Sequence, residues 1–447
     1  MVKEVLPMKQ HYDVIIVGTG AAGLYTALSL PSKLHILMIS KDSLTNSDSY
    51  LAQGGISTLR NKEDYTPYYE DTLKAGRYEN NPESVRIMIE ESPAIIDHLQ
   101  ELGVLFDRNT DGNLRYTREG GHSTFRILHH KDVTGKEIVS KLLARAKERA
   151  NITLLDFTTM LDLIEEHGQC HGVIIRTKEG QILPLLASSV VLATGGIGGL
   201  FKSSTNFSHI SGDSFAIALK HKITVSNLHY IQIHPTVLYS KKPGRRFLIS
   251  ESVRGEGAIL LNENKERFVN ELLPRDVVTA AIKEEMERFH TEYVYLSLNT
   301  MSIPDIQNRF PNIYQRCLEE GYQLGKDLIP VTPAQHYLMG GIETNTSGAT
   351  SMKRLYAVGE TACNGVHGLN RLASNSLLES LVFAGRAAKE IKKFTSPFVP
   401  PNITLSLHDY KDMDILQEEY RQLLLSEIKE KDGEFYAKWC NNENKCR

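Results

Sequence analysis

Near its N-terminus the chain reads Tyr12-Asp13-Val14-Ile15-Ile16-Val17-Gly18-Thr19-Gly20-Ala21-Ala22-Gly23, an apolar run followed by three spaced glycines. We expect a strand over residues 12–17, a turn at Gly18–Gly23 and a helix that ends near Leu30. A second strand over Leu34–Ile39 completes a β-α-β unit. In that context the G-x-G-x-x-G pattern predicts a dinucleotide-binding turn.

Each glycine of this turn has its own task. Gly18 permits a tight turn, Gly20 lets the backbone approach a pyrophosphate, and Gly23 brings the helix close to the strand. The positive end of the helix dipole attracts the phosphates. The turn therefore predicts cofactor contacts by Gly18, Thr19, Gly20, Ala21, Ala22 and Gly23.

The end of the second strand departs from the usual pattern. It normally carries an acidic residue for the ribose hydroxyls, whereas here it reads Ser40-Lys41. Either Asp42 takes over that role, or Ser40 and Lys41 contact the cofactor in another way. The turn alone does not identify the nucleotide.

The composition is that of a globular protein and argues against a nucleic-acid-binding, membrane-spanning or secreted protein. At 447 residues the chain has room for two or three domains. A net charge of −3, without any Lys/Arg-rich block, argues against nucleic acid as a partner. Apolar runs such as Val14–Val17 are far shorter than the roughly 20 residues of a bilayer span. Residues 1–9 do not resemble a secretory signal, so we expect a cytoplasmic protein without membrane contact.

The cysteines do not predict a metal site. They are scattered along the chain, at Cys170, Cys317, Cys363, Cys440 and Cys446. No two of them have the close spacing of a zinc or iron–sulfur site, so we expect reduced thiols and no metal. Cys363 falls near the predicted site, where packing is the expected explanation for it.

Two further apolar runs end in glycine, as buried parallel strands do beside a ligand. One is Ser188–Ala193, followed by Thr194-Gly195-Gly196, and the other is Leu355–Val358, followed by Gly359-Glu360. Between them, residues 227–338 contain more charge and several prolines. We interpret this segment as an inserted domain.

The predicted fold class is α/β, a Rossmann-like nucleotide-binding domain interrupted by an α+β domain. The first domain would comprise residues 9–226 and 339–396, and the insert residues 227–338. A short helical region over 397–447 would follow. Its linker would be Pro397–Pro401, and its helix, Met413–Lys429, has apolar residues at helical spacing: Leu416, Tyr420, Leu423 and Leu424.

The stretch His367–Glu379 predicts an anion site at the start of a helix. A histidine and Arg371 precede an Asn/Ser cap and an apolar helical run. A helix start offers free N–H groups and the positive end of a dipole. Arg371 can bind a carboxylate through two parallel hydrogen bonds.

Together these segments resemble the flavoprotein family of succinate dehydrogenase, fumarate reductase and L-aspartate oxidase. The resemblance runs from residue 10 to residue 391 and includes the stretch His367–Glu379. It also rests on seven separate motifs: Ala52-Gln53-Gly54-Gly55, Ala193-Thr194-Gly195-Gly196, Gly212-Asp213, His234-Pro235-Thr236, Arg254-Gly255-Glu256-Gly257, Pro274-Arg275-Asp276 and Gly359-Glu360.

The resemblance implies FAD as the cofactor. Glu360 would reach its ribityl or ribose part, and Asp213 would also contact it. Ser376 and Leu377 would lie at the flavin ring, where the helix start would stabilise the negative charge of reduced flavin. The other implied cofactor-binding residues are Ser40, Lys41, Asp48, Ser49, Tyr50, Leu51, Ala52, Gln53, Gly54, Gly55, Thr194, Gly195, Gly196 and Asn375.

Two positions discriminate within the family. Membrane-linked succinate dehydrogenases attach FAD through a histidine, and the matching position here is Asp48, so non-covalent FAD is expected. Thr117–Ser123 resembles the L-aspartate oxidase signature, and the dehydrogenases have an apolar residue where Glu119 stands. Aspartate differs from succinate by one amino group, and a carboxylate is the natural partner of an ammonium.

The same resemblance implies a dicarboxylate site. His234, His336 and Arg371 would hold the carboxylates, with Ser250 among the substrate-binding residues and Tyr337 and Gln335 able to share the task of His336. Arg275 would stand beside the carbon that loses hydrogen and act as proton donor or acceptor. Glu251 and Arg254 would relay the proton, and the inserted domain would close over the flavin as a capping domain.

The implied reaction is oxidation of L-aspartate to iminoaspartate, with oxygen or fumarate as electron acceptor. It would be the first step of NAD biosynthesis through quinolinate, followed by a quinolinate synthase. Two alternatives stay open: a soluble fumarate reductase of the same family, and a flavin-binding subunit without catalysis. L-Aspartate oxidases usually end in a longer domain of three helices, which Phe435–Asn442 does not resemble, so we expect a shortened version.

Overall fold

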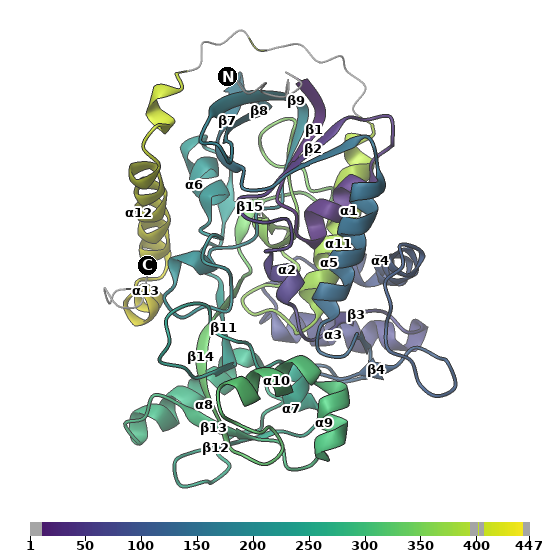
Figure 1. Ribbon diagram of the computed structural model, residues 1–447, viewed down its shortest axis with the longest axis vertical. Coiled ribbons are helices and arrows are strands. Elements are labelled where there is room, and N and C mark those ends of the chain that lie inside the picture. Colours follow the sequence, from purple (N-terminus) through teal and green to yellow (C-terminus); the bar gives the residue numbers. More distant parts are fainter. Residues whose placement is uncertain (1–10, 394–400, 402–405, 441–447) are drawn as a thin grey trace, which may run out of the picture.

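The N-terminal β-α-β unit lies at the centre of the largest sheet. A computed structural model of the chain describes residues 11–393, 401 and 406–440, and Figure 1 shows how its elements are arranged. The sheet has seven strands in the order β6-β2-β1-β9-β8-β7, with β16 also paired to β9. The strands are β1 His11–Val17, β2 Ile36–Ile39, β6 Ile152–Leu155, β7 Thr159–Glu166, β8 Gln169–Arg176, β9 Ile182–Leu192 and β16 Leu355–Ala357.

Parallel pairing gathers the strand ends that matter for binding. β1 pairs in parallel with β2 and with β9, β2 pairs with β6, and β9 pairs with β16. β7 and β8 are added in antiparallel pairing. The carboxyl ends of the parallel strands therefore share one edge, which is where open α/β sheets bind ligands.

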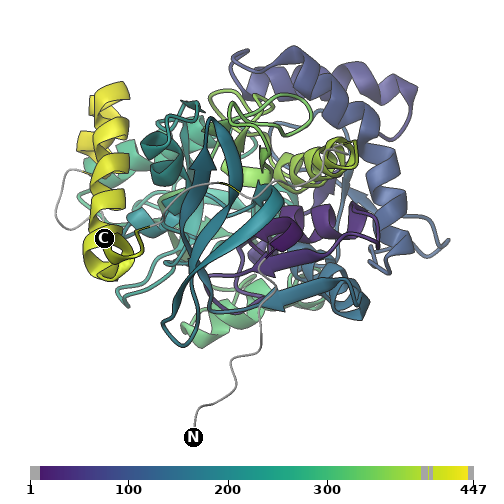
Figure 2. The same ribbon diagram turned by 90° about the horizontal axis from the view of Figure 1, so that it is seen from above.

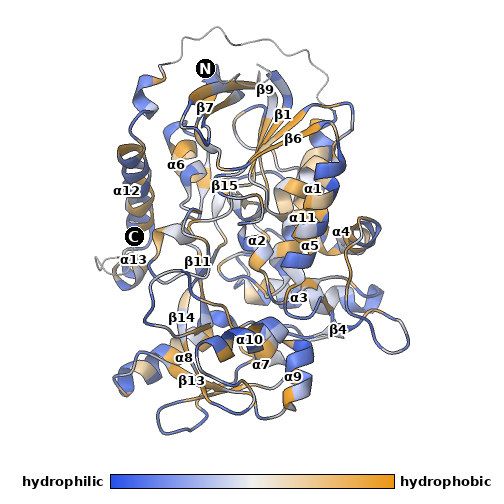
Figure 3. Ribbon diagram, viewed as in Figure 1, coloured by the Kyte–Doolittle hydropathy of each residue, from blue (hydrophilic) through white to orange (hydrophobic). Residues whose placement is uncertain are grey.

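Both faces of β1 are buried, which explains its continuous apolar run. Val14 and Ile16 belong to one hydrophobic core, whereas Ile15 and Val17 belong to a second. Figure 2 shows α11 and α12 on opposite sides of the sheet, and Figure 3 shows the apolar strands between them. The helices that contribute to the first core include α1 Ala21–Ser29, α5 Thr134–Glu148 and α11 Asn375–Ile391, and those of the second include α6 Asp213–Lys220 and α12 Met413–Lys431.

Further elements complete this nucleotide-binding lobe, which we define as residues 11–226 and 339–393. The helices are α2 Asp48–Leu51, α3 Tyr65–Ala75 and α4 Pro82–Glu101, with 3-10 turns at Lys62–Asp64, Gly198–Leu200 and Gly359–Thr361. The strands form two small sheets: β3 Ile56–Ser57, β5 Ile127–Leu128 and β4 Tyr116–Thr117, and β10 Val225–Ser226, β15 Gly341–Glu343 and β17 Ala362–Cys363.

A second lobe, which we call the capping lobe, is formed by residues 231–338 and has its own apolar core. Its antiparallel sheet has the order β11-β14-β13-β12. The strands are β11 Ile231–Leu238, β12 Ile259–Leu261, β13 Val294–Ser297 and β14 Ile329–Leu338, and the helices are α7 Glu251–Gly255, α8 Arg275–Arg288, α9 Ile303–Arg309 and α10 Pro311–Glu319. The lobe starts and ends on adjacent strands, since Ile231 pairs with Leu338.

The C-terminal helices pack on the nucleotide-binding lobe. After a 3-10 turn at His408–Tyr410, α12 packs against α6, and α13 Gly433–Trp439 packs against α12. The side chains of Leu416, Tyr420 and Leu424 are buried as predicted, but Leu423 is 36% exposed because the buried face of α12 is rotated toward Leu425. Of the predicted linker Pro397–Pro401, residues 397–400 lie outside the described residues.

Two further findings concern residues outside the binding region. Cys170, Cys317 and Cys363 are buried thiols that form no disulfide, and Cys446 lies outside the described residues. Among residues 11–393 and 406–440, no helix combines the length and the apolar character that crossing a bilayer requires.

Candidate active site

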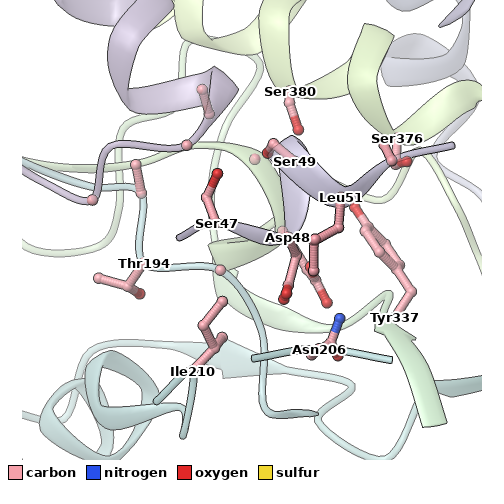
Figure 4. A pocket seen from close by; sticks show the side chains of 18 of the residues that line it. Ser47, Asp48, Ser49, Leu51, Thr194, Asn206, Ile210, Tyr337, Ser376 and Ser380 are labelled. Carbon is pink, nitrogen blue, oxygen red and sulfur yellow. The ribbon is translucent and has the colours of Figure 1, made fainter. Parts of the chain in front are cut away.

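A cavity runs along the carboxyl edge of the large sheet and continues between the two lobes. It encloses about 1710 Å³, its open mouth included. The glycine turn after β1, the helix α2 and the end of β9 line one part, and the start of α11 with His234 and Arg275 of the capping lobe lines the other. Figure 4 shows side chains from α2, including Asp48 and Leu51, and Ser376 and Ser380 of α11 around this space.

The glycine turn has the geometry expected of a dinucleotide-binding loop. Gly18 has a φ of +114°, and a Cβ atom there would lie 2.1 Å from the carbonyl oxygen of Ala193. Helix α1 begins within the predicted turn, at Ala21, and no side chain caps it, so its first N–H groups stay available for phosphate. Gly23 packs against the Gly18 carbonyl, which brings helix and strand together.

The end of the second strand resolves the choice between Asp42 and its neighbours. Ser40 and Lys41 line the cavity, whereas Asp42 accepts hydrogen bonds from the Ser43 N–H and the Asn46 amide within its own loop. The Lys41 ammonium donates to the Asp213 carboxylate at 2.6 Å. Asp213 therefore faces the cavity as half of an ion pair rather than as a lone carboxylate.

Two half-buried carboxyl groups, those of Asp48 and Glu360, line the cavity. The Glu360 carboxylate accepts from the Leu338 N–H at 2.8 Å, and burial, followed by the charge of Asp48, raises the pKa of Glu360 to about 8. Burial raises the pKa of Asp48 to about 7, and its Oδ2 atom has no hydrogen-bond partner. A carboxyl group with an unpartnered oxygen beside a cavity is suited to the hydroxyl groups of a ribityl chain.

Most of the predicted cofactor-binding residues line the cavity, and five do not. Gly196 leaves room for Glu360, because a Cβ atom at position 196 would lie 2.2 Å from the Glu360 Oε1 atom. Asn375 accepts from the hydroxyls of Ser57 and Tyr68 and so anchors α11 from behind. The residues in the wall are Gly18, Thr19, Gly20, Ala22, Ser40, Lys41, Asp48, Ser49, Leu51, Ala52, Gln53, Gly54, Gly55, Thr194, Gly195, Asp213, Glu360, Ser376 and Leu377, and those outside it are Ala21, Gly23, Tyr50, Gly196 and Asn375.

The prediction that an Asn or Ser side chain caps α11 is wrong in one respect. Ser374 stands at the cap position, but its φ of 62° is left-handed and its side chain accepts no helix N–H. Its hydroxyl donates instead to the Glu119 carboxylate at 2.7 Å. The helix start thus keeps its N–H groups for a ligand, and Arg371 donates to the hydroxyl of Ser376 in the first turn.

Two arginines from different lobes meet at the end of the cavity. Arg275, the first residue of α8, and Arg371 both donate to the side-chain oxygen of Gln232, at 2.8 and 3.3 Å. The guanidinium of Arg371 also lies 4.1 Å from the ring centroid of Tyr337. Burial, and then Arg275, lower the pKa of Arg371 to about 10, which leaves it charged at neutral pH. Two cations this close favour a dicarboxylate.

The two histidines contribute hydrogen-bond donors rather than charge. Burial and nearby arginines hold the pKa values of His234 and His336 well below their usual range, so both rings are neutral. The Thr236 N–H donates to Nδ1 of His234, which places the proton of that ring on Nε2. Among the described residues this buried Nε2 atom has no hydrogen-bond partner, so its N–H is available to an acceptor in the cavity. His336 is held by Thr205 at 2.7 Å.

An acidic residue stands directly behind Arg275. The Glu251 carboxylate accepts from Nε of Arg275 at 2.6 Å and lies 3.5 Å from Arg254. Burial alone would raise the pKa of Glu251, but Arg254 and Arg275 hold that pKa below its usual value. Glu251 lines the cavity together with Ser250, whereas Arg254 is buried behind them and donates to the Glu271 carbonyl.

Glu119 also lies in the wall of the cavity, beside Ser250 and Glu251. Its side chain is buried, and a Cβ atom on Gly54 would lie 2.7 Å from its Oε1 atom, so a side chain at position 54 would displace the carboxylate. The structure therefore brings together Glu119, Arg275 and Arg371 at one end of the cavity, the combination that the sequence predicted.

Sequence reasoning missed several residues of this site, among them Gln232 and Arg245. Gln232 lies two residues before His234 on β11, and the period of a strand places both on one face, so that signal was present. Arg245 lines the cavity from a charged loop that reads as an ordinary surface turn, and no local pattern indicates its role. Tyr337 lines the cavity, whereas Gln335 bonds to Ser204 behind it.

Comparisons with known proteins agree with this geometry. The family described as "FAD binding domain" matches residues 13–377. The chain is 50% identical over 422 residues to an L-aspartate oxidase of Clostridium perfringens, covering 94% of this chain and 95% of that protein. It is 51% identical over 385 residues to an L-aspartate oxidase of Clostridium acetobutylicum, covering 86% and 88%.

Solved structures of flavoproteins have the same fold as this chain. A quinol fumarate reductase from E. coli superposes with a TM-score of 0.81 at 30% identity, covering 87% of this chain and 72% of that one. The predicted fold class and the family resemblance are both confirmed. The chain belongs to the FAD-binding flavoprotein family of the L-aspartate oxidases and fumarate reductases, and FAD is its cofactor.

Proposed function

We propose that the chain is an L-aspartate oxidase that converts L-aspartate to iminoaspartate. The observation that carries this proposal is the carboxylate of Glu119 in the wall of the same cavity as Arg275 and Arg371. Arg371 and the histidines match the carboxylates of aspartate, Arg275 is left for proton transfer, and Glu119 matches the ammonium. Membership of the family supports the redox chemistry.

The chain's own residues divide the binding task. Arg371 and the Nε2–H of His234 are placed to hold the carboxylates, with His336 and Ser250 completing the wall. Gln232 fixes the two arginines relative to each other, because both donate to its oxygen. A substrate gripped at both ends is held in one orientation, which lowers the entropic cost of reaction.

The reaction removes one hydride and one proton from the ammonium form of aspartate. Bound FAD supplies the hydride acceptor. We assign the proton to Arg275, which takes it up only as it passes its own Nε proton to Glu251, because a charged guanidinium cannot hold a further proton; Gln232 holds its Nη1 atom. Glu251 is next in line to receive it, at 2.6 Å from Arg275, and Arg254 stabilises the charge of Glu251 from behind. The capping lobe would exclude water from this step.

We further propose that FAD is bound non-covalently, because Asp48 stands where a histidyl link would form. Acid precipitation should then release all flavin into the supernatant. Oxygen or fumarate would accept the two electrons, and the iminoaspartate would pass to a quinolinate synthase in the cytoplasm, at the start of NAD biosynthesis. The domain limits 9–226, 227–338, 339–396 and 397–447 and the individual residue roles stay predictions.

One experiment tests the activity directly. Under anaerobic conditions L-aspartate should bleach the flavin absorbance of the purified holoenzyme, whereas succinate should not. Bleaching by succinate alone would contradict the proposal. Kinetics of Glu119→Gln with aspartate and with fumarate separate an aspartate oxidase from a soluble fumarate reductase, since only aspartate turnover should depend on the carboxylate. Turnover by the isolated chain would exclude a non-catalytic subunit.

A further inference from the structure

The segment Thr117–Ser123 lies in the seam between the two lobes and contacts both. Towards the capping lobe, the Thr117 hydroxyl donates to Glu256 at 3.3 Å and the Gly121 N–H donates to the Leu272 carbonyl at 3.1 Å. Towards the nucleotide-binding lobe, the His122 ring bonds to the Ala373 carbonyl at 2.9 Å. The segment is thus fixed by groups that are far apart in the sequence.

Glu119, within this segment, also contacts both lobes, one through each of its two carboxylate oxygens. The hydroxyl of Ser252, in α7 of the capping lobe, donates to Oε1, and the hydroxyl of Ser374, just before α11, donates to Oε2 at 2.7 Å. All three side chains are buried. A carboxylate has about four lone-pair directions, so two hydroxyl donors leave room for an ammonium from the cavity.

The capping-lobe side of this arrangement is itself held in place. Ser250 caps α7, and its hydroxyl donates to the Ser252 hydroxyl at 3.1 Å. The Ser252 proton is thereby directed to Glu119. Gly120 brings the same segment against α7, because a Cβ atom there would lie 2.2 Å from the Glu251 Oε1 atom.

We propose that Ser252 and Ser374 are positioning residues for amine recognition, one from each lobe, which aim the Glu119 carboxylate at the substrate ammonium. Discrimination between aspartate and an amine-free dicarboxylate then depends on contact between the lobes. Binding of the two substrate carboxylates does not depend on these two hydroxyls, because His234 and the arginines are held by other partners. This inference rests on the proposed aspartate oxidase function.

The test compares two ligands that differ only in the amino group. Ser252→Ala should raise the KM for L-aspartate about tenfold, as expected for the loss of a hydrogen bond to a charged group. The Kd of succinate, measured by perturbation of the flavin spectrum, should change less than about twofold, since no amine is involved. Ser297→Ala, in strand β13 of the same lobe, is the matched control, because Ser297 is buried but does not line the cavity.

A second pair of variants isolates the hydroxyl. Thr and Val have nearly the same shape, so Ser252→Thr should retain most of the aspartate affinity and Ser252→Val should lose it. This comparison holds even where the alanine variant does not fold. In the background Glu119→Gln, Ser252→Ala should have little further effect on KM, because the two residues act as one unit.

The outcomes separate this inference from the proposed function. If L-aspartate reduces the wild-type flavin but Ser252→Ala leaves its KM unchanged, the inference fails alone. It also fails if the KM for L-aspartate and the Kd of succinate rise by the same factor in Ser252→Ala, since Ser252 would then support the cavity as a whole. If L-aspartate does not reduce the wild-type flavin, the proposed function fails first.

Discussion

At the end of the cavity proposed to bind substrate, the positive charge lies on guanidinium groups and not on imidazoles. His234 and His336 are kept neutral by burial, whereas Arg371 keeps its charge at neutral pH. Neutral histidines still donate one N–H each, and they do so without a change of protonation near pH 7. The two histidines are therefore expected to add no pH dependence to dicarboxylate binding between about 6 and 8, unlike histidines that bind in the protonated form.

At the residue scale, Arg275 gives the sharpest prediction. Replacement by leucine removes both the guanidinium at the reacting carbon and the partner of Glu251. Turnover should fall by about 10²–10⁴-fold, the usual contribution of a proton-transfer group, while flavin absorbance per protein stays unchanged. Arg288→Leu, at the exposed end of the same helix, is the control, because its side chain is 65% exposed. Retained turnover would remove Arg275 from the chemistry.

A second residue-scale prediction concerns Asp48 and the stability of the apoprotein. An unfolded aspartate titrates near about 3.9, whereas the pKa of Asp48 in the fold is about 7. The folded state therefore binds more protons between these values, so the contribution of Asp48 to stability decreases as pH rises through that window. Asp48→Asn should raise the melting temperature at pH 8 more than at pH 4. An equal shift at both would contradict this assignment.

At the element scale, the β1–α1 turn is the least tolerant part of the cofactor site. Gly18 combines a φ of +114° with a carbonyl 2.1 Å from any Cβ atom. Gly18→Ala should therefore displace the turn and yield protein without flavin, measured as the ratio of flavin to protein absorbance. Gly433→Ala at the start of α13 is the control, because a Cβ atom there meets nothing within 4 Å. A flavin-replete Gly18→Ala protein would contradict the role of this turn.

The same elements show what the sequence could and could not predict. The apolar strand and spaced glycines identified the β-α-β unit, because strand, turn and helix are neighbours in the chain. The cap of α11 was misread, since Ser374 bonds to Glu119, which lies 255 residues away. Leu423 was placed with its helical neighbours, but which side of α12 is buried depends on its packing against α6. Such facts depend on tertiary contacts that local patterns do not contain.

At the scale of the whole molecule, one ligand is expected to contact both lobes. His234 and Arg275 belong to the capping lobe, and Arg371 belongs to the nucleotide-binding lobe. Succinate at 100 times its Kd should add about 2.7 kcal/mol to the stability of the state that binds it. Hydrogen exchange should therefore slow in β11 and β14 as well as in α11.

Arg371→Leu provides the control for this coupling. Without the guanidinium, succinate should no longer slow exchange in α11, and the effect on the capping lobe should decrease with it. Protection confined to one lobe in the unmodified protein would show that the ligand does not span the seam.

The pairing of Ile231 with Leu338 suggests a way to remove the capping lobe from this chain. The whole capping lobe leaves the main body and returns to it at two residues that face each other across a single pair of strands. A segment attached in this way can be removed as one unit, since a short hairpin could join its two ends without moving them. A chain in which a tight turn joins Ile231 to Leu338 should still fold and retain flavin, yet it would possess only half of the groups that grip a substrate.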